Sequence, residues 1–186
     1  MRYLFGLSVI LLILLSACNL PGPEQTIVPE TAPAKPTDTP AQDVPYTECG
    51  FVWAREPLAE LSKEFDTALK AVQPGASGYA EAYGENCLNN QGEVVRFMAM
   101  ETDFYVTLKI RDLEDKSVLG ELIEQVLAVV AEFPVDETPG PQPGYVGIMF
   151  EAPGNELRMW FTQLDAQAAI DKGLQGEELF NSLQAE

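Results

Sequence analysis

The chain has 186 residues, with 29 acidic and 11 basic side chains, so its formal net charge is −18. A surface this acidic argues against nucleic acid as a partner, because phosphates bind to basic surfaces. The sequence contains no histidine, which removes Ser-His-Asp and Cys-His catalysis and nearly all catalytic zinc sites. We therefore expect no enzyme activity, no cofactor and no metal.

The first 18 residues have the pattern of an export signal. Arg2 is followed by a small-or-apolar run over residues 4–14 and then by Leu15-Ser16-Ala17-Cys18. The run is shorter than the roughly 20 residues that a membrane-spanning helix needs. These four residues resemble the lipobox of bacterial membrane lipoproteins, which implies cleavage before Cys18 and acylation of its thiol. The alternative is an ordinary secretory signal followed by a chance cysteine.

This resemblance predicts three segments and a location. Residues 1–17 are the signal peptide. Residues 18–45 are the lipidated cysteine and a linker rich in proline and threonine, too poor in apolar residues to fold. Residues 46–186 are one domain of the commonest size. Two or more acyl chains hold a protein stably on a membrane, so we expect a lipid-anchored protein on the extracytoplasmic face of the cell membrane or outer envelope.

In the domain, a helix is predicted first, from Pro57 to the Pro74-Gly75 stop, because apolar residues recur at spacings of three and four. A hairpin follows, with strands over residues 78–88 and from 94 to 110 around an Asn-Asn-Gln-Gly turn. The second strand exceeds normal lengths, so we expect a bulge or bend at residues 101–103. We expect its even-numbered side chains, including those of Met98 and Met100, to face the core.

The remaining chain repeats this order. A second helix is predicted from about Ser117 to Phe133, then a loop over residues 139–144 and a hairpin with strands 145–152 and 156–164. Short helices follow, at residues 165–172 and 177–183. The order αββ-αββ-α predicts an α+β fold, a mainly antiparallel sheet with helices on one face. If the bend is a turn, the order becomes αβββ-αββ-α, similar in element count to the type III secretion chaperone-like fold.

Cys49 and Cys87 are the remaining cysteines, an even pair in an exported chain. We expect a disulfide between them. Closing a loop of about 38 residues stabilises a fold by roughly 4 kcal/mol in the chain-entropy model. The bond would tie down the segment before the first helix and so hold Phe51 and Trp53 on the core.

A candidate binding face follows from the strand alternation. Even-numbered residues point inward on the strand at residues 94–110. By the same alternation the inward residues of the second hairpin are Val146, Ile148, Phe150, Leu157, Met159 and Phe161. The outward positions then carry the aromatic side chains of Phe97, Tyr105, Tyr145 and Trp160. Exposed apolar patches on a sheet face usually mark a partner or ligand. We therefore expect a module that binds an envelope protein or a small ligand. The alternative is that Phe51, Trp53 or the C-terminal helix covers this face.

Two other functions remain open. Glu101 and Asp103 lie at the expected bulge and could serve a carboxylate-dependent hydrolase of envelope or extracellular substrates. The chain could also be a structural or assembly lipoprotein of the envelope. A calcium site at Asp112, Glu114 and Asp115 is disfavoured, because the glycine turn and distal glutamate of an EF-hand are missing.

Overall fold

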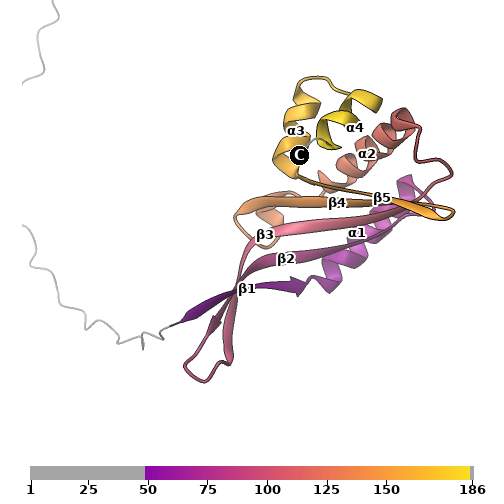
Figure 1. Cartoon of the computed structure of the whole chain (residues 1–186). Coiled ribbons are helices and arrows are strands. Elements are labelled where there is room, and N and C mark those ends of the chain that lie inside the picture. Colours follow the sequence, from indigo (N-terminus) through magenta and orange to yellow (C-terminus); the bar gives the residue numbers. More distant parts are fainter. Residues whose placement is uncertain (1–48, 185–186) are drawn as a thin grey trace, which may run out of the picture. The chain divides into compact units, whose positions relative to one another are not determined.

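The computed structural model describes residues 49–184, so the predicted signal, Cys18 and the linker lie outside the described residues. Figure 1 shows the arrangement of the helices and strands. In chain order they are β1 Gly50–Pro57, α1 Ala59–Val72, β2 Ser77–Leu88, β3 Val94–Lys109, α2 Lys116–Val130, the 3-10 turn η1 Val135–Glu137, β4 Gln142–Ala152, β5 Asn155–Thr162, α3 Gln163–Asp171 and α4 Gly176–Gln184.

The strands form one sheet in the order β1-β2-β3-β4-β5. Neighbours are antiparallel except β3 and β4, which run parallel. A parallel pair needs a crossover connection, and α2 lies within the chain that joins these two strands. The predicted α+β class, with a mainly antiparallel sheet, is confirmed; the sheet is mixed because of this one pair.

β1 is the main departure from the predicted order. Residues 50–57 form an edge strand paired with β2, so the observed order is βαββ-αββ-αα. Phe51 is 51% exposed and Trp53 60% exposed. The prediction that these two side chains pack on the core is therefore wrong. An edge strand takes its order from backbone pairing with one neighbour, and this does not require burial of its side chains.

The helices cover one face of the sheet, and the core lies between the helices and that face. Asp115 caps α2 by accepting a hydrogen bond from the backbone N–H of Val118, 3.2 Å away, which satisfies one of the free donors at a helix start. Apolar side chains from α1, α2, α3 and α4 meet those of the sheet in a single cluster. Its largest fully buried members include Phe65, Phe104, Phe150, Phe161 and Phe180.

β3 runs unbroken over residues 94–109, so the predicted bend is not a turn. Its pairing is nevertheless irregular at three points, the first of them opposite the end of β2, where the register shifts between Cys87 and Leu88. Opposite β2 the register shifts so that Met100 has no partner, and opposite β4 it shifts again between Thr102 and Phe104. Extra residues of this kind are β-bulges, which bend a strand and re-aim its side chains.

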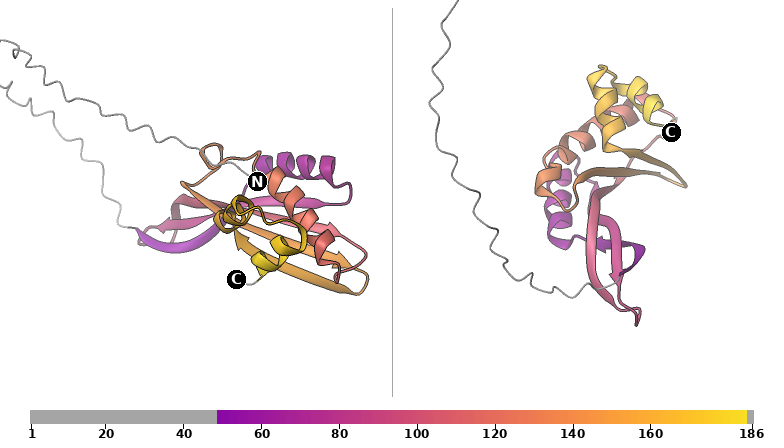
Figure 2. Two further views of the ribbon diagram at one scale, coloured as in Figure 1. Left: turned by 90° about the horizontal axis from the view of Figure 1, so that it is seen from above. Right: turned by 90° about the vertical axis from the view of Figure 1, so that its left-hand side faces the viewer.

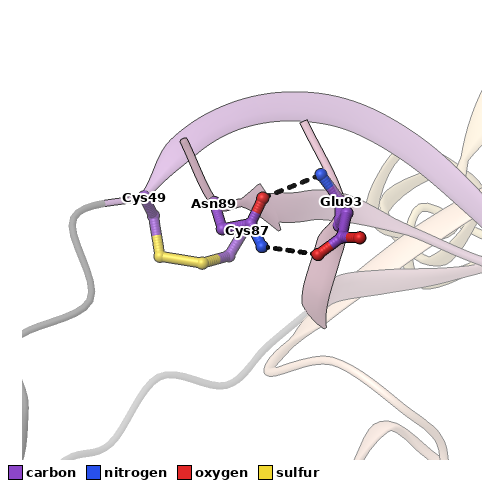
Figure 3. The surroundings of a disulfide bond; sticks show 4 residues. All are labelled: Cys49, Cys87, Asn89 and Glu93. Carbon is purple, nitrogen blue, oxygen red and sulfur yellow. Dashed lines mark hydrogen bonds between the residues drawn. A yellow bond between two sulfur atoms is a disulfide. The ribbon is translucent and has the colours of Figure 1, made fainter. Parts of the chain in front are cut away.

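Figure 3 shows the disulfide that joins Cys49 to Cys87, whose Cα atoms are 5.0 Å apart. It links the start of β1 to the end of β2, beside the β2–β3 turn. Asn89 closes that turn: its Oδ1 accepts from the backbone N–H of Glu93 and its Nδ2 donates to the Glu93 carboxylate, both at 2.9 Å. Of the helices in residues 49–184, none has the length and apolar character to cross a bilayer.

Candidate binding site on the open face of the sheet

The sheet has a second face, and in Figure 2 the helices of residues 49–184 lie on the opposite side of it. We call it the open face. Cross-strand pairing places Tyr79 beside Tyr105, Tyr105 beside Gly147, and Gly147 beside Trp160. Paired residues share a face of the sheet, so one row crosses four strands from β2 to β5.

The aromatic side chains of this row are in contact. The rings of Tyr79 and Tyr105 stack with their centroids 4.6 Å apart and their planes at 6°. Trp160 lies 5.2 Å from Tyr105 at 41° and 5.2 Å from Tyr145 at 14°. Such pairs contribute about 0.5–1.5 kcal/mol beyond their buried area. Tyr145 is not in the cross-strand row itself but joins it by stacking on Trp160. We call Tyr79, Tyr105, Tyr145 and Trp160 together the aromatic row.

Gly147 makes the row continuous. A Cβ atom at this position would lie 2.6–2.7 Å from the Trp160 ring and 3.2 Å from the Tyr105 ring. The absent side chain therefore lets the indole lean across β4 until it reaches the tyrosine on β3. In the strand pairing, Gly147 lies between these two residues, so a side chain there would keep the rings from approaching in this way.

A cavity of about 430 Å³ borders the aromatic row. This volume falls within the usual range for small-molecule sites, roughly 300–1,000 Å³. Trp160 is 42% exposed and Tyr79 is 47% exposed, so ring surface is available to a ligand. The cavity is lined by Tyr79, Tyr105, Val106, Thr107, Gly147, Ile148, Met149, Arg158, Met159 and Trp160.

Beside the aromatic row lies a charged cluster centred on Arg55. Its guanidinium donates a 3.0 Å hydrogen bond to Asp103 and another to the Tyr105 hydroxyl, and it lies 3.7 Å from the Glu81 carboxylate. It also sits over the Tyr83 ring, 5.2 Å from the centroid, a distance at which cation–π attraction operates. Arg55 thus reaches from the edge strand across β2 to β3.

Asp103 is the buried partner in this cluster, only 1% exposed. Its second oxygen accepts a 2.9 Å hydrogen bond from the backbone N–H of Tyr145. The donor lies where the β3–β4 register shifts. At a bulge, some backbone N–H groups have no partner on the neighbouring strand, and a buried N–H group needs a hydrogen-bond acceptor. Asp103 therefore secures the irregular stretch of β4 and holds Arg55 at the same time.

In this region, burial and the negative charge of Asp103 together raise the pKa values of Tyr105 and Glu101. Burial, reinforced by the negative charge of Asp103, raises the pKa of Tyr105 to about 12. The same two causes, in the same order, raise the pKa of Glu101, against the opposing effect of Arg55. In both cases the uncharged form is favoured.

Three of the four residues predicted for the binding face, Tyr105, Tyr145 and Trp160, come together in the aromatic row. The fourth, Phe97, pairs with Asn86, whereas Tyr105 pairs with Tyr79. Asn86 and Tyr79 are an odd number of residues apart on β2, so they point to opposite faces. The bulge at Met100 thus reverses the alternation that placed Phe97 beside Tyr105. By the same register Met98, which pairs with Glu85, shares the open face and not the core face.

Arg55, Tyr79 and Gly147 are parts of the site that strand alternation in the sequence does not predict. Alternation in Phe51-Val52-Trp53-Ala54-Arg55 was a signal for a strand, and it would have placed Phe51, Trp53 and Arg55 on one face. Tyr79 alternates with alanine in its own strand, and Gly147 has no side chain, so the sequence does not show that the two share a site. Their place in it depends on which strands pair and in which register. The suggested cover by Phe51, Trp53 or the C-terminal helix does not occur over the aromatic row: Trp53 stacks on Tyr83, 5.3 Å away, and α4 packs chiefly on α2.

The carboxylates considered for other functions are placed as follows. Asp103 is held by Arg55 and Tyr145, and Glu101 is half-buried on the row next to it. Asp112 accepts a hydrogen bond from the backbone N–H of Glu114, and Asp115 caps α2. Residues 49–184 contain no group of three or more acidic or cysteine side chains placed to hold a metal ion.

Comparisons with protein-family models, curated proteins and solved structures found no match to this chain.

Proposed function

We propose that the protein is a binding module whose ligand docks on the aromatic row, in the cavity lined by Tyr79, Tyr105 and Trp160. The observation that carries this proposal is the exposure of stacked rings on the helix-free face. Domains usually bury aromatic side chains of this size, and exposed clusters of them commonly mark binding surfaces. The module acts at the envelope, where the lipid anchor proposed from the sequence would hold it.

The local structure favours a prepared binding surface. The rings are fixed by one another, by the space at Gly147 and by the hydrogen bond from Arg55 to the Tyr105 hydroxyl. A surface ordered before binding loses less conformational entropy when the ligand arrives. Such order at exposed side chains has no evident role in the core, which lies on the other face.

Crosslinked pull-down from envelope extracts tests this proposal with two matched variants. The chain contains two tryptophans, Trp53 and Trp160, and both are exposed. Trp160→Ala removes the centre of the aromatic row, whereas Trp53→Ala removes an equal ring outside the cavity. We expect Trp160→Ala to lose components that the parent protein and Trp53→Ala retain. An identical set of captured components for all three proteins would contradict the proposal.

The proposed lipid anchor on Cys18 has a separate test. Intact-mass analysis of the membrane form should show loss of residues 1–17 and gain of a diacylglycerol group on the new N-terminus. Cys18→Ser should shift the protein from the detergent phase to the aqueous phase. Unchanged partitioning of this variant would refute the anchor and leave the binding proposal to stand on the open face alone.

The hydrolase alternative depends on Glu101, because Asp103 is engaged on both oxygens. Glu101→Gln is the direct test of it, with purified domain and peptidoglycan or glycoside substrates. Hydrolysis by the parent protein that this substitution abolishes would replace the binding proposal with an enzymatic one. A structural or assembly role would appear in the pull-down as partners that neither tryptophan variant loses.

A further inference from the structure

The chemistry of the cavity narrows the class of ligand, on the premise that the proposed function is correct. We infer that the cavity takes an uncharged carbohydrate, a short oligosaccharide whose sugar rings lie against Trp160 and Tyr79. The inference rests on three features of the described residues: the charges at the cavity, the exposed aromatic rings that line it, and the hydrogen-bonding groups among the lining residues.

The charges argue against ionic ligands. Arg158 is the one charged residue among those lining the cavity, and its guanidinium is paired with Glu156 at 2.9 Å. An organic cation would lie against this guanidinium and would find no carboxylate among the residues that line the cavity. An anion would face a chain of net charge −18, and like charge lowers both encounter rate and affinity. The neighbouring Arg55 is committed to Asp103 and Glu81. An uncharged ligand avoids both penalties.

The walls fit a ring with apolar faces. Tyr79 and Trp160 are each more than two-fifths exposed and border the same cavity. The faces of aromatic rings carry partial negative charge, and the C–H bonds on a sugar face carry partial positive charge. A sugar therefore packs flat on such rings without giving up hydration of its hydroxyl groups, which lie around its edge.

The polar groups of the lining suit the edge of a sugar. Thr107 and Arg158 lie in the row next to Tyr105 and Trp160: Thr107 pairs with Met149, and Met149 with Arg158. Hydroxyl and guanidinium groups donate hydrogen bonds to sugar oxygens. A few polar groups set among apolar walls are the usual composition of a small-ligand site. A purely apolar ligand would displace water from the Thr107 hydroxyl without offering it a hydrogen bond.

A fluorescence titration tests the inference, because Trp53→Phe leaves Trp160 as the sole tryptophan. Four probes of the same length differ in charge: N-acetylchitotriose and cellotriose are neutral, the glucosamine trimer is cationic, and trigalacturonate is anionic. We expect saturable Trp160 changes with at least one neutral trimer, at least about tenfold tighter than with either charged trimer. Affinity should be equal at low and high salt, because no ion pair forms.

Two further variants in the same background locate the site. Tyr79→Ala should weaken binding of the neutral trimer about tenfold, the effect of losing one stacked ring. Tyr83→Ala removes a ring on the open face that does not line the cavity, and it should leave affinity unchanged. Equal weakening by both variants would contradict a site at the cavity.

The outcomes separate this inference from the proposed function. A response to the glucosamine trimer or to trigalacturonate alone overturns the uncharged class. If no trimer changes Trp160 emission while Trp160→Ala still loses envelope components in the pull-down, the carbohydrate inference fails and the binding module stands. If the pull-down is indifferent to Trp160, the proposed function fails and this inference fails with it.

Discussion

The two faces of the sheet use the same strands for different purposes. On the helix face, Phe104 and Phe150 are at most 1% exposed and sit in a cluster made of apolar side chains. On the open face, Tyr105 and Trp160 are stacked on other aromatic side chains, with charged groups beside them and a cavity in front. Phe104 and Tyr105 are adjacent in the chain, yet only the first belongs to the core.

The side chains of the open face are therefore ordered by other interactions than those of the helix face. The helix face is ordered by burial, which contributes about 1.5–3 kcal/mol for each large apolar side chain. The open face is ordered by ring stacking, by the Arg55–Asp103 pair and by space at Gly147. Because the two sources are distinct, substitutions should separate stability from the geometry of the aromatic row.

The largest expected effect comes from the core. Phe150→Ala removes a fully buried ring and should lower the free energy of unfolding by about 3–5 kcal/mol. Trp160→Ala on the neighbouring strand removes a larger side chain but an exposed one, so its cost should be about 1 kcal/mol, the loss of its ring contacts. Urea denaturation of both variants measures the contrast. Equal losses would show that the open face is part of the core.

The disulfide comes next, because it holds the edge strand that supplies Arg55. A Cys49→Ser, Cys87→Ser double variant should lose up to about 4 kcal/mol. For a domain of this size 1 kcal/mol corresponds to roughly 2–8 °C, so the Tm should fall by several degrees or more. Hydrogen exchange should increase first in β1, because this edge strand has β2 as its one neighbour in the sheet. An unchanged Tm would contradict this role of the disulfide.

Arg55 should contribute more to the free energy of unfolding than its exposed position suggests. Arg55→Leu leaves the buried Asp103 carboxylate with one fewer partner, which should cost about 1–3 kcal/mol. Arg158→Leu is the matched control, because its partner Glu156 is itself half exposed, and exposed pairs contribute about 0–1 kcal/mol. Chemical denaturation of the two variants compares them. A loss in Arg158→Leu as large as in Arg55→Leu would argue against the buried pair.

Gly147→Ala should change the aromatic row with little effect on stability. The new methyl group meets the far edge of the Trp160 ring, which is half exposed and can move outward. We expect a change in free energy of unfolding within about 1 kcal/mol, since the displaced ring is not part of the core. Trp160 emission, measured in the Trp53→Phe background, should shift to longer wavelength. An unaltered spectrum would show that the ring does not lie over Gly147.

The effect that is smallest at neutral pH is the proton equilibrium of Tyr105, which influences stability only in alkaline solution. The pKa of Tyr105 is raised to about 12, so the folded state keeps this proton between pH 10 and about 12 while the unfolded chain loses it. The folded state binds more protons in that window, and the free energy of unfolding therefore falls as pH rises through it. The pKa of Tyr79 is also raised, by burial and by the charge of Glu81, so the titration is made in a Tyr79→Phe background. Rapid spectrophotometric titration should there show a late tyrosinate step that Tyr105→Phe removes. A Tyr105→Phe curve that keeps this step would contradict the shift.

The sequence allowed the helix face to be predicted in detail, because alternation and helical spacing depend on neighbouring residues. Val146, Ile148, Phe150 and Phe161 were expected to point inward, and all four are buried. The open face was predicted in part. Phe97 was misplaced because a bulge changes alternation without changing composition. Gly147 and Arg55 were missed because their contacts join strands far apart in the chain, β3 to β5 and β1 to β3.

Ligand binding on the aromatic row can be observed directly at Trp160. The indole N–H signals of Trp53 and Trp160 are the two tryptophan signals expected in a ¹⁵N NMR spectrum, and Trp53→Phe assigns them. On addition of solubilised envelope extract, we expect the Trp160 signal to shift or broaden while the Trp53 signal does not move. A shift of Trp53 alone, or no change in either signal, would contradict it.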